Sequence, residues 1–192
     1  MAHGHKFNPH MLERLKDPAR LESQNPEAIW SIVGGGELRV VVDVGAGLGF
    51  FAIPFSRHMP QGKVIACDIS EEMLEHLRGV LTSEGVRNVE PRRSDEVELP
   101  VGAGEADLVF MANLHHEFDH PEQSLAEALR VLRPGGRLAI MDWKPGESPT
   151  GPPLHVRIPE ASVRAQLEAA GFDDVQSSPI LPYHYLLTAT RP

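Results

Sequence analysis

The sequence predicts an α/β fold built on a mostly parallel sheet, and three observations lead to this prediction. A run of β-branched residues at 38–44 leads directly into three glycines at alternate positions, Gly45, Gly47 and Gly49. Further apolar runs of strand length alternate along the chain with segments whose apolar residues recur at helical spacing. The first run lacks polar alternation, which is typical of a parallel strand that is buried on both faces.

Seven strands are predicted, in a Rossmann-like doubly wound sheet that is mostly parallel and has an antiparallel last strand. The third strand contains Pro91, and it is expected at an edge of the sheet because proline cannot donate a ladder hydrogen bond. The last two strands follow each other without a helix, so they are expected to form an antiparallel pair at one side. The predicted strands cover residues 38–44, 63–68, 88–93, 105–112, 137–143, 172–177 and 183–190.

The helices between these strands are predicted from caps and breakers. Asn25 before Pro26 favours a helix start, and Ser70 before two glutamates favours another. The segment 144–157 is rich in proline and glycine and is expected to be a loop. The predicted helices begin near Pro26, Phe50 or Phe51, Ser70, Pro121 and Pro159, and they end at Gly34, near residue 59, at Gly85, at Arg133 and at Gly171.

Length and composition favour a single domain over residues 1–192. Within it we expect an N-terminal helical cap (1–35) and a core that binds the main ligand (38–143). A loop on the substrate side (144–158) and a C-terminal helix with the closing strand pair (159–192) complete the expected organisation.

Charge and cysteine content limit the partners and the compartment. The chain has 27 acidic against 18 basic residues and a formal net charge of -9, which disfavours a nucleic-acid partner. Cys67 is the only cysteine, so a reducing compartment is expected. No apolar run approaches the roughly 18 residues that cross a bilayer, and the N-terminus lacks the apolar core of a signal peptide. We therefore expect a cytoplasmic protein with no membrane partner. The N-terminal histidines are interpreted as a solvated leader, with metal binding as the alternative; they are His3, His5 and His10.

The glycine turn and a downstream acid together indicate a nucleotide site. Glycine lacks a Cβ, so a ligand can approach the main chain closely at Gly45 and Gly47. Asp68 ends the second predicted strand, 19 residues beyond Gly49. In a βαβ unit of this kind, an acid at that position accepts hydrogen bonds from ribose hydroxyls. The alternative is that Asp68 merely precedes the helix cap Ser70.

Five spaced motifs carry a resemblance to a known family. The dinucleotide fingerprint Gly-x-Gly-x-x-Gly does not fit, because Leu48 alone separates the last two glycines. The stretch Asp43-x-Gly45-x-Gly47-x-Gly49 instead resembles the first motif of class I S-adenosylmethionine-dependent methyltransferases, in particular the methyltransferase type 11-like, compact small-molecule subgroup. The remaining motifs follow in the family's order: Asp68; Ser94-Asp95-Glu96 with Leu99-Pro100; Ala106–Val109 with Leu114-His115-His116; and Leu132–Leu138.

The resemblance implies a set of residues that bind S-adenosyl-L-methionine. Asp43 and the backbone of the glycine turn would hold the methionine part, Asp68 the ribose, and Asp95 the adenine amino group. Main-chain contacts are implied at the end of the fourth strand. The full implied set is Asp43, Gly45, Ala46, Gly47, Gly49, Asp68, Ile69, Asp95, Glu96, Asn113 and Leu114.

The catalytic candidates lie at the carboxyl ends of the fourth and fifth strands, where such sheets bind ligands. They are His115, His116 and Asp142, and a histidine there can take a proton from the acceptor near neutral pH. The alternative is that one histidine of the pair packs against the following helix or caps it. Metal binding by His115, His116 and His120 is a further alternative, but no metal is predicted.

The function predicted from these residues is transfer of a methyl group to a small-molecule acceptor by in-line displacement. The short segments outside the core favour a small acceptor over a nucleic acid. Two alternatives stay open: an S-adenosylmethionine-binding protein without catalysis and, with less support, a nicotinamide-dependent oxidoreductase. The second lacks both the dinucleotide spacing and a Tyr-x-x-x-Lys pair.

Overall fold

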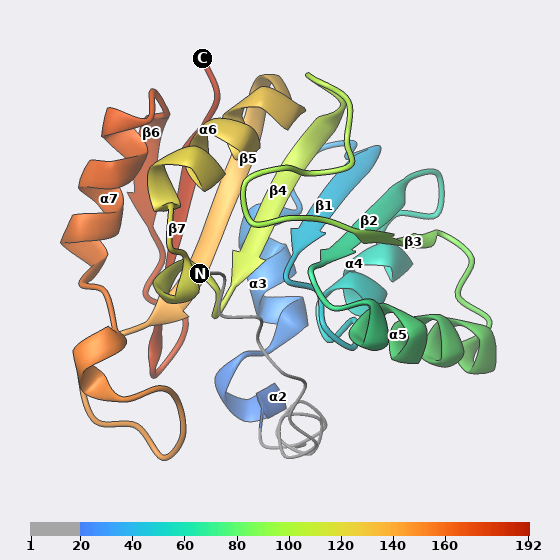
Figure 1. Cartoon of the computed structure of the whole chain (residues 1–192), viewed down its shortest axis with the longest axis horizontal. Coiled ribbons are helices and arrows are strands. Elements are labelled where there is room, and N and C mark those ends of the chain that lie inside the picture. Colours follow the sequence, from blue (N-terminus) through green and yellow to red (C-terminus); the bar gives the residue numbers. More distant parts are fainter. Residues whose placement is uncertain (1–19) are drawn as a thin grey trace.

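The structure, a computed structural model of the chain, describes residues 20–192. They form a seven-stranded sheet in the order β3-β2-β1-β4-β5-β7-β6 (Figure 1). Strand β7 runs antiparallel to β5 and β6, and the other neighbours are parallel, which confirms the predicted fold class. The strands are Val40–Val44 (β1), Lys63–Asp68 (β2), Val89–Arg93 (β3), Ala106–Ala112 (β4), Leu132–Trp143 (β5), Asp173–Ser177 (β6) and His184–Thr190 (β7).

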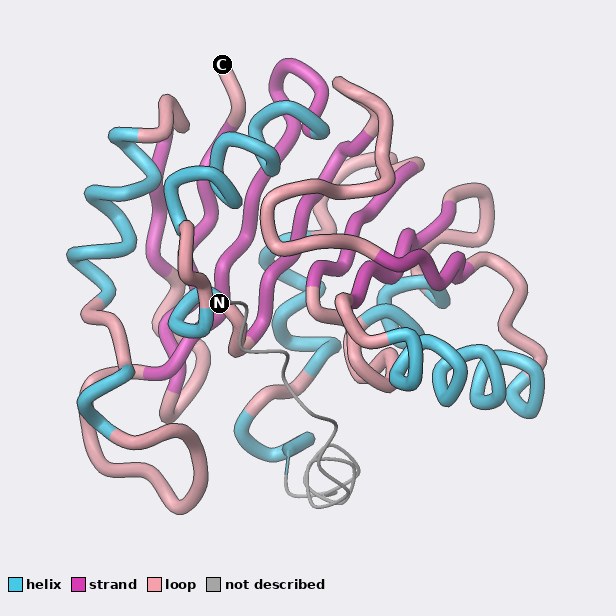
Figure 2. Tube along the Cα trace, viewed as in Figure 1, coloured by secondary structure: helices cyan, strands magenta, loops and turns pink. Residues whose placement is uncertain are grey.

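Helices flank the sheet (Figure 2), and on each face an apolar cluster packs the helices against it. One cluster joins the sheet to α6 and α7, and the other joins the opposite face to α3, α4 and α5. In β1, Val42 packs in the first cluster and Val41 in the second, so both faces are buried and polar alternation is absent. The helices are Arg20–Ser23 (α2), Pro26–Val33 (α3), Ala52–Arg57 (α4), Glu71–Glu84 (α5), Pro121–Val131 (α6) and Glu160–Ala169 (α7), with short 3₁₀ helices at His115–Glu117 (η1) and Leu154–Val156 (η2).

The predicted helix caps are present. The Asn25 side chain accepts from two backbone N–H groups at the start of α3, and the Ser70 hydroxyl accepts from Met73 N at the start of α5. Gly85 follows α5 with φ of 68°, the left-handed conformation that glycine adopts without strain. These local signals position both helices without reference to the rest of the chain.

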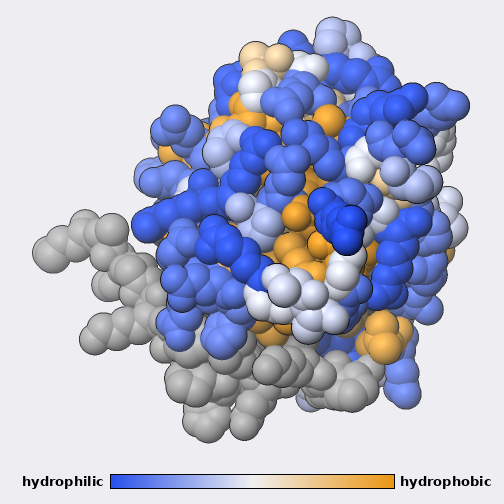
Figure 3. All heavy atoms as spheres, turned by 90° about the vertical axis from the view of Figure 1, so that its right-hand side faces the viewer, coloured by the Kyte–Doolittle hydropathy of each residue, from blue (hydrophilic) through white to orange (hydrophobic). Residues whose placement is uncertain are grey.

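Strand β3 lies at the edge of the sheet, as Pro91 predicts. Its charged residues include Glu90 and Arg92, whose side chains pair at 2.6 Å. Figure 3 views the molecule from this edge and shows a mostly hydrophilic face with apolar side chains visible near its middle. Charged side chains on an edge strand discourage pairing with another chain.

Several predicted boundaries differ from the structure by one or two residues, and the start of β5 differs by more. Strand β5 begins at Leu132 rather than Arg137, because Leu132 already pairs with Ala106 before the Arg133–Gly136 break. The break is therefore a register shift inside the strand and not a separate turn. Helix α4 begins at Ala52, since the chain between the last glycine and Phe51 is still in turns.

Other expectations concern regions that the structure describes only in part. The leader histidines His3, His5 and His10 and the first part of the cap lie outside the described residues. From residue 20 onward, no helix has both the length and the apolar character that crossing a bilayer requires. The segment 144–158 is a loop interrupted by η2, and Arg157 holds it by donating to the carbonyls of Lys144, Gly146 and Pro152.

Candidate functional site

The glycine turn folds back onto the end of β2. Gly45 N and Ala46 N donate to the Cys67 carbonyl at 2.8 and 2.9 Å, and Gly47 N donates to the Asp68 carboxylate at 2.9 Å. Gly45 has φ of 72°, and a Cβ there would lie 2.9 Å from the Leu114 side chain. Glycine is therefore required both by the left-handed backbone and by the close approach of Leu114.

Asp43 is buried beneath this turn and is 2% exposed. Its Oδ2 atom has no hydrogen-bond partner. The pKa of Asp43 is raised to about 8, chiefly by burial; a hydrogen bond from Ala52 N and the charge of Arg20 act against the rise, and the nearby carboxylate of Asp68 adds to it. A nearby cation would stabilise the ionised form of such a carboxyl group.

Asp68 links the turn to the next helix. Its second oxygen accepts from Ser70 N at 2.9 Å, so Asp68 also contributes to the start of α5, as the alternative interpretation holds. Burial raises the pKa of Asp68, and hydrogen bonds from Ser70 N and Gly47 N oppose this. The neighbouring Ile69 side chain is 54% exposed beside it.

Asp95 and Glu96 follow β3, next to the end of β2. Ser94 N donates to the Asp68 carbonyl at 3.1 Å, which brings this loop beside the ribose-binding candidate. Asp95 is exposed, and its Oδ1 accepts from Glu96 N at 2.6 Å. The Glu96 side chain accepts from His120 N at 2.6 Å and so joins this loop to the start of α6.

Asn113 and Leu114 follow β4, and the Leu114 side chain lies against the glycine turn. Asn113 has φ of 55°, an uncommon backbone conformation for a residue other than glycine. Its Nδ2 donates to Gln24 Oε1 at 2.9 Å, and its Oδ1 has no partner. Arg20 places its guanidinium 3.9 Å from the centre of the Phe50 ring. Sequence patterns did not point to Gln24 or Arg20, because both contacts span long stretches of chain.

The two neighbouring histidines have different surroundings. His115 is buried against α7, where its Nε2 lies 2.8 Å from Gln166 Oε1, and burial lowers its pKa. His116 Nδ1 lies 2.8 Å from Asp142 Oδ1, and His116 N donates to the other oxygen of Asp142 at 3.0 Å. Burial acts to lower the pKa of His116, but the hydrogen bond and the charge of Asp142 outweigh it and raise the pKa. His115 therefore packs against α7 rather than against the following helix α6, and His116, oriented by Asp142, remains the candidate base.

Comparison with known proteins identifies the family. Residues 41–136, half of the chain, match the family described as a methyltransferase domain. A crystal structure of an S-adenosylmethionine-dependent methyltransferase from Aquifex aeolicus is 34% identical, with coverage of 97% of this chain and 100% of its own and a TM-score of 0.89. The chain belongs to the S-adenosylmethionine-dependent methyltransferases.

Curated methyltransferases match over a shorter stretch. A ubiquinone/menaquinone biosynthesis C-methyltransferase of Pseudomonas entomophila is 36% identical over 105 residues, which are 54% of this chain and 41% of that protein. A mitochondrial 2-methoxy-6-polyprenyl-1,4-benzoquinol methylase of Caenorhabditis elegans is 35% identical over 107 residues, 53% of this chain and 37% of that protein. The chain therefore spans about two fifths of the length of these relatives.

The cofactor of this methyltransferase family is S-adenosylmethionine. The residues at the carboxyl ends of the parallel strands, here called the carboxyl edge of the sheet, fit it. Its sulfonium and ammonium groups are cationic, and the buried Oδ2 of the Asp43 carboxyl group accepts no hydrogen bond. The Asp68 carboxylate, next to the glycine turn, accepts hydrogen bonds from Gly47 N and Ser70 N. The chemistry of Asp43 and Asp68 thus fits this cofactor: both carry carboxyl groups that would hold its cationic and hydroxyl groups.

Unpartnered buried polar atoms concentrate at this edge of the methyltransferase. Buried polar groups are normally paired, so each exception in the described part of the chain calls for an explanation. Strand β7 is antiparallel, and its start pairs with the end of β5, where Tyr185 lies opposite Asp142 and His184 opposite Trp143. The side chains with such atoms follow or end β1 and β4 or begin β7; they are Asp43, Asn113, His115, His184 and Tyr185. His184 and Tyr185 belong to none of the sequence motifs, because a histidine or tyrosine at the start of a strand carries no pattern of its own.

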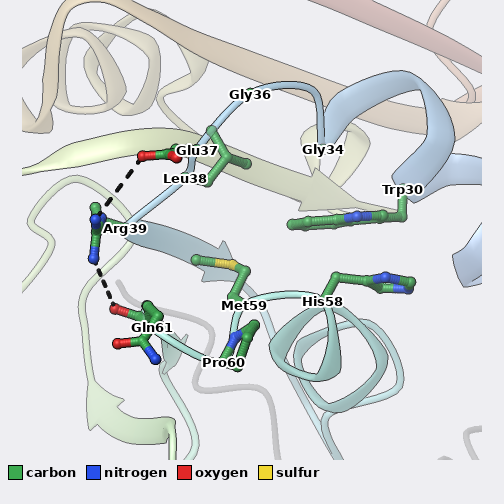
Figure 4. A pocket seen from close by; sticks show the side chains of 11 residues that line it. Trp30, Gly34, Gly36, Glu37, Leu38, Arg39, His58, Met59, Pro60 and Gln61 are labelled. Atoms are coloured by element: carbon green, nitrogen blue, oxygen red, sulfur yellow. Dashed lines mark hydrogen bonds and ion pairs between the residues drawn. The ribbon is translucent and has the colours of Figure 1, made fainter.

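A hollow of about 320 Å³ lies at the other end of the strands, beside the start of β1 (Figure 4). Its walls include Trp30, whose ring stacks on His58 at a centroid distance of 5.2 Å. It also includes Leu38 and Arg39, which precede β1, so it faces away from the glycine turn and contains none of the predicted site residues. Among residues 20–192, no three histidine, cysteine, aspartate or glutamate side chains gather as metal ligands.

Proposed function

We propose that this protein transfers a methyl group from S-adenosylmethionine to a small-molecule acceptor by in-line displacement. The observation that carries the proposal is that the glycine turn with Asp43 and the His116–Asp142 pair end strands at the same edge of the sheet. Only β4 separates β1 from β5, so the two groups lie about two strand spacings, ~10 Å, apart. That separation suits a cofactor on one side and an acceptor on the other.

In this proposal the cofactor lies over the ends of β1, β2 and β4. Asp43 balances the positive charge of the methionine part, Asp68 holds the ribose, and Asp95 faces the adenine amino group. The backbone of Gly45, Ala46, Gly47 and Gly49 lines the turn, and Ile69, Glu96, Asn113 and Leu114 complete the contact. When bound, the cofactor supplies a methyl group on a sulfonium that is already a good leaving group, so the protein mainly aligns the acceptor and excludes water.

His116 is the base that removes the acceptor's proton. Asp142 accepts from His116 N and lies 2.8 Å from Nδ1, so Nε2, which is 3.8 Å from Glu117 Oε1, is the nitrogen that takes the proton. Its raised pKa makes it a stronger base than an ordinary histidine. An acceptor whose nucleophile carries a proton, such as a hydroxyl group or an acidic carbon, therefore fits this site best.

A small acceptor is supported by what surrounds this edge. Among the described residues, the segments beside it are short: α2, followed by Gln24, which contacts Asn113, and the loop 144–158. The names of the curated relatives are consistent with small acceptors, since the two compared above are quinone-biosynthesis methylases. The acidic composition gives no support to a nucleic-acid acceptor.

The proposal is tested in two steps. Calorimetric titration with S-adenosylmethionine, S-adenosylhomocysteine and NADH is expected to give micromolar binding of the first two and none of NADH. Release of S-adenosylhomocysteine is then measured with hydroquinone, catechol, a carboxylic acid and a primary amine, and the hydroxyl compounds are expected to respond. Cofactor binding without turnover of any small molecule would support a non-catalytic binding protein instead, and preferential NADH binding would support an oxidoreductase.

A further inference from the structure

His184 is a buried histidine without hydrogen bonds. It is 0% exposed, and neither ring nitrogen has a partner. A buried donor or acceptor without a partner loses its hydration and gains nothing in return, which destabilises the fold. Such a cost is commonly retained where a group serves a ligand.

Its place in the sheet separates it from the cofactor. His184 begins β7 and lies opposite Trp143 at the end of β5, on the same edge as the glycine turn. Strands β4 and β5 stand between β1 and β7, so about 14 Å of sheet separates it from the Asp43 strand. A ligand group that meets His184 therefore belongs to the acceptor side.

The imidazole is held in one orientation by its neighbour. The rings of His184 and Trp143 lie 4.1 Å apart between centroids, tilted by 44°. The Arg157 guanidinium lies 5.2 Å from the Trp143 ring, and a Cβ at Gly151 would come within 2.9 Å of it. The indole is thus fixed by the loop 144–158, and it fixes the histidine in turn.

The charges around His184 keep it neutral. Burial lowers its pKa to about 4, helped by the positive charges of Lys144, Arg157 and Arg20 and opposed by Asp142. The Lys144 ammonium already donates to the Leu181 carbonyl at 2.8 Å. A neutral imidazole carries one donor and one acceptor, which match a hydroxyl or carbonyl group better than a charged one.

We propose that His184 binds the methyl acceptor and selects one that carries an uncharged oxygen group, a hydroxyl or a carbonyl, apart from the atom that is methylated. This inference rests on the proposed function, because it assumes that an acceptor lies at this edge. His116 acts on the reacting group, and His184 recognises the second one. Polyhydroxylated or hydroxy-carbonyl compounds form the expected substrate class.

The test compares His184→Phe with His184→Gln. Phenylalanine keeps a ring against Trp143 but has no nitrogen, whereas glutamine keeps a donor and an acceptor close to the position of Nε2. The matched control is His58→Phe, a histidine stacked on Trp30 at the opposite edge, whose Nε2 lies 2.7 Å from Glu27 Oε2. The acceptor probe is whichever of hydroquinone and catechol releases more S-adenosylhomocysteine, with phenol as the analogue that lacks the second oxygen group.

We expect His184→Phe to raise the KM of the probe at least tenfold and to leave the S-adenosylmethionine Kd within twofold. The wild-type preference for the probe over phenol should disappear in His184→Phe and return in part in His184→Gln. Thermal melting can be measured without an acceptor. Because the variant lacks an unpartnered buried polar group, the Tm of His184→Phe should exceed that of the wild type by about 2–6 °C. His58→Phe should change neither the KM nor the preference.

An unchanged KM and preference in a folded His184→Phe variant would overturn the inference and leave the proposed function intact. A Tm that falls by several degrees would also overturn it, because the imidazole would then have a structural partner. If neither hydroquinone nor catechol is methylated while the carboxylic acid or the amine is, the selection for uncharged oxygen fails although methyl transfer stands. If no compound is methylated, the proposed function fails first and takes this inference with it.

Discussion

Asp107 and Asp43 are both buried carboxylates on central strands, but they lie at opposite edges of the sheet. Asp107 accepts from Arg39 N, Val40 N and Arg133 Nε at 2.6–2.8 Å. These bonds outweigh burial, and the pKa of Asp107 lies below its usual value. Asp43 has an unpartnered oxygen, and burial raises its pKa to about 8.

The hydrogen bonds of Asp107 stabilise the fold, whereas Asp43 is the residue proposed to bind the cofactor. At the amino ends of the parallel strands, here called the amino edge, Asp107 connects the start of β4 to the start of β1 and to Arg133 in the break of β5. Both of its carboxylate oxygens accept hydrogen bonds. At the carboxyl edge the unpartnered atoms of Asp43, Asn113 and His184 are kept at a cost to the fold.

Asp107→Ala should give the largest loss of stability. It leaves two backbone N–H groups and a guanidinium without their acceptor, and the expected loss is about 3–5 kcal/mol, a Tm lower by roughly 6–15 °C. Because the pKa of Asp107 is lowered, its contribution is complete at neutral pH and is lost as the pH falls through that pKa in acid. Thermal melts between pH 3 and 8 measure this. Cofactor affinity should stay within twofold, and a large loss of affinity would contradict the division between the edges.

His116→Gln should lower turnover about 100-fold or more, since it removes the proposed base, while the cofactor Kd stays within twofold. The wild-type rate should rise with pH through the raised pKa of His116, above the ordinary value for histidine. Asp142→Asn should shift that rise to lower pH, because it removes the charge that raises the pKa. Rate profiles from pH 5 to 9 measure both. His115→Gln is the matched control with an expected loss below fivefold, and equal losses in the two variants would assign His116 a structural role.

Asp68→Ala should weaken S-adenosylmethionine binding more than tenfold. Little stability should be lost, about 1 kcal/mol, because the backbone hydrogen bonds that disappear, among them those from Gly47 N and Ser70 N, lie in a partly exposed region. Calorimetric titration and thermal melts give the two quantities. Asp68→Asn, which keeps one oxygen acceptor, should fall between wild type and alanine, and an unchanged Kd in Asp68→Ala would remove this residue from the site.

Asp43 should release a fraction of a proton when the cationic cofactor binds at pH 7. Its raised pKa means that the folded protein without cofactor holds this proton, and a nearby positive charge favours the carboxylate. Titrations in phosphate and in Tris, whose ionisation enthalpies differ, measure the release. Because the folded pKa is raised, stability without cofactor should fall between about pH 4 and pH 8, and Asp43→Asn should flatten that fall. Identical heats in the two buffers would show that Asp43 is already charged.

Local patterns predicted most of the fold. The valine run of β1, the proline of β3 and the caps at Asn25 and Ser70 each act through their own backbone or a few neighbours, and all appear where expected. The start of β5 was missed, because its pairing with Ala106 is a contact between strands that carries no signal at Leu132 itself. The family was predicted from motif order and is confirmed by the match over residues 41–136.

The sequence by itself determined the order of strands and helices, the glycine turn and the identity of the acids beside it, because backbone conformation follows from residues close together in the chain. Only the tertiary structure decided that His116 rather than His115 meets Asp142, that Leu114 lies on Gly45, and that His184 faces Trp143. These contacts join residues on different elements, and burial and pairing are set by how those elements pack. The roles proposed for them follow from that packing. Polar groups at the carboxyl edge lack hydrogen-bond partners, whereas Asp107 at the amino edge has them.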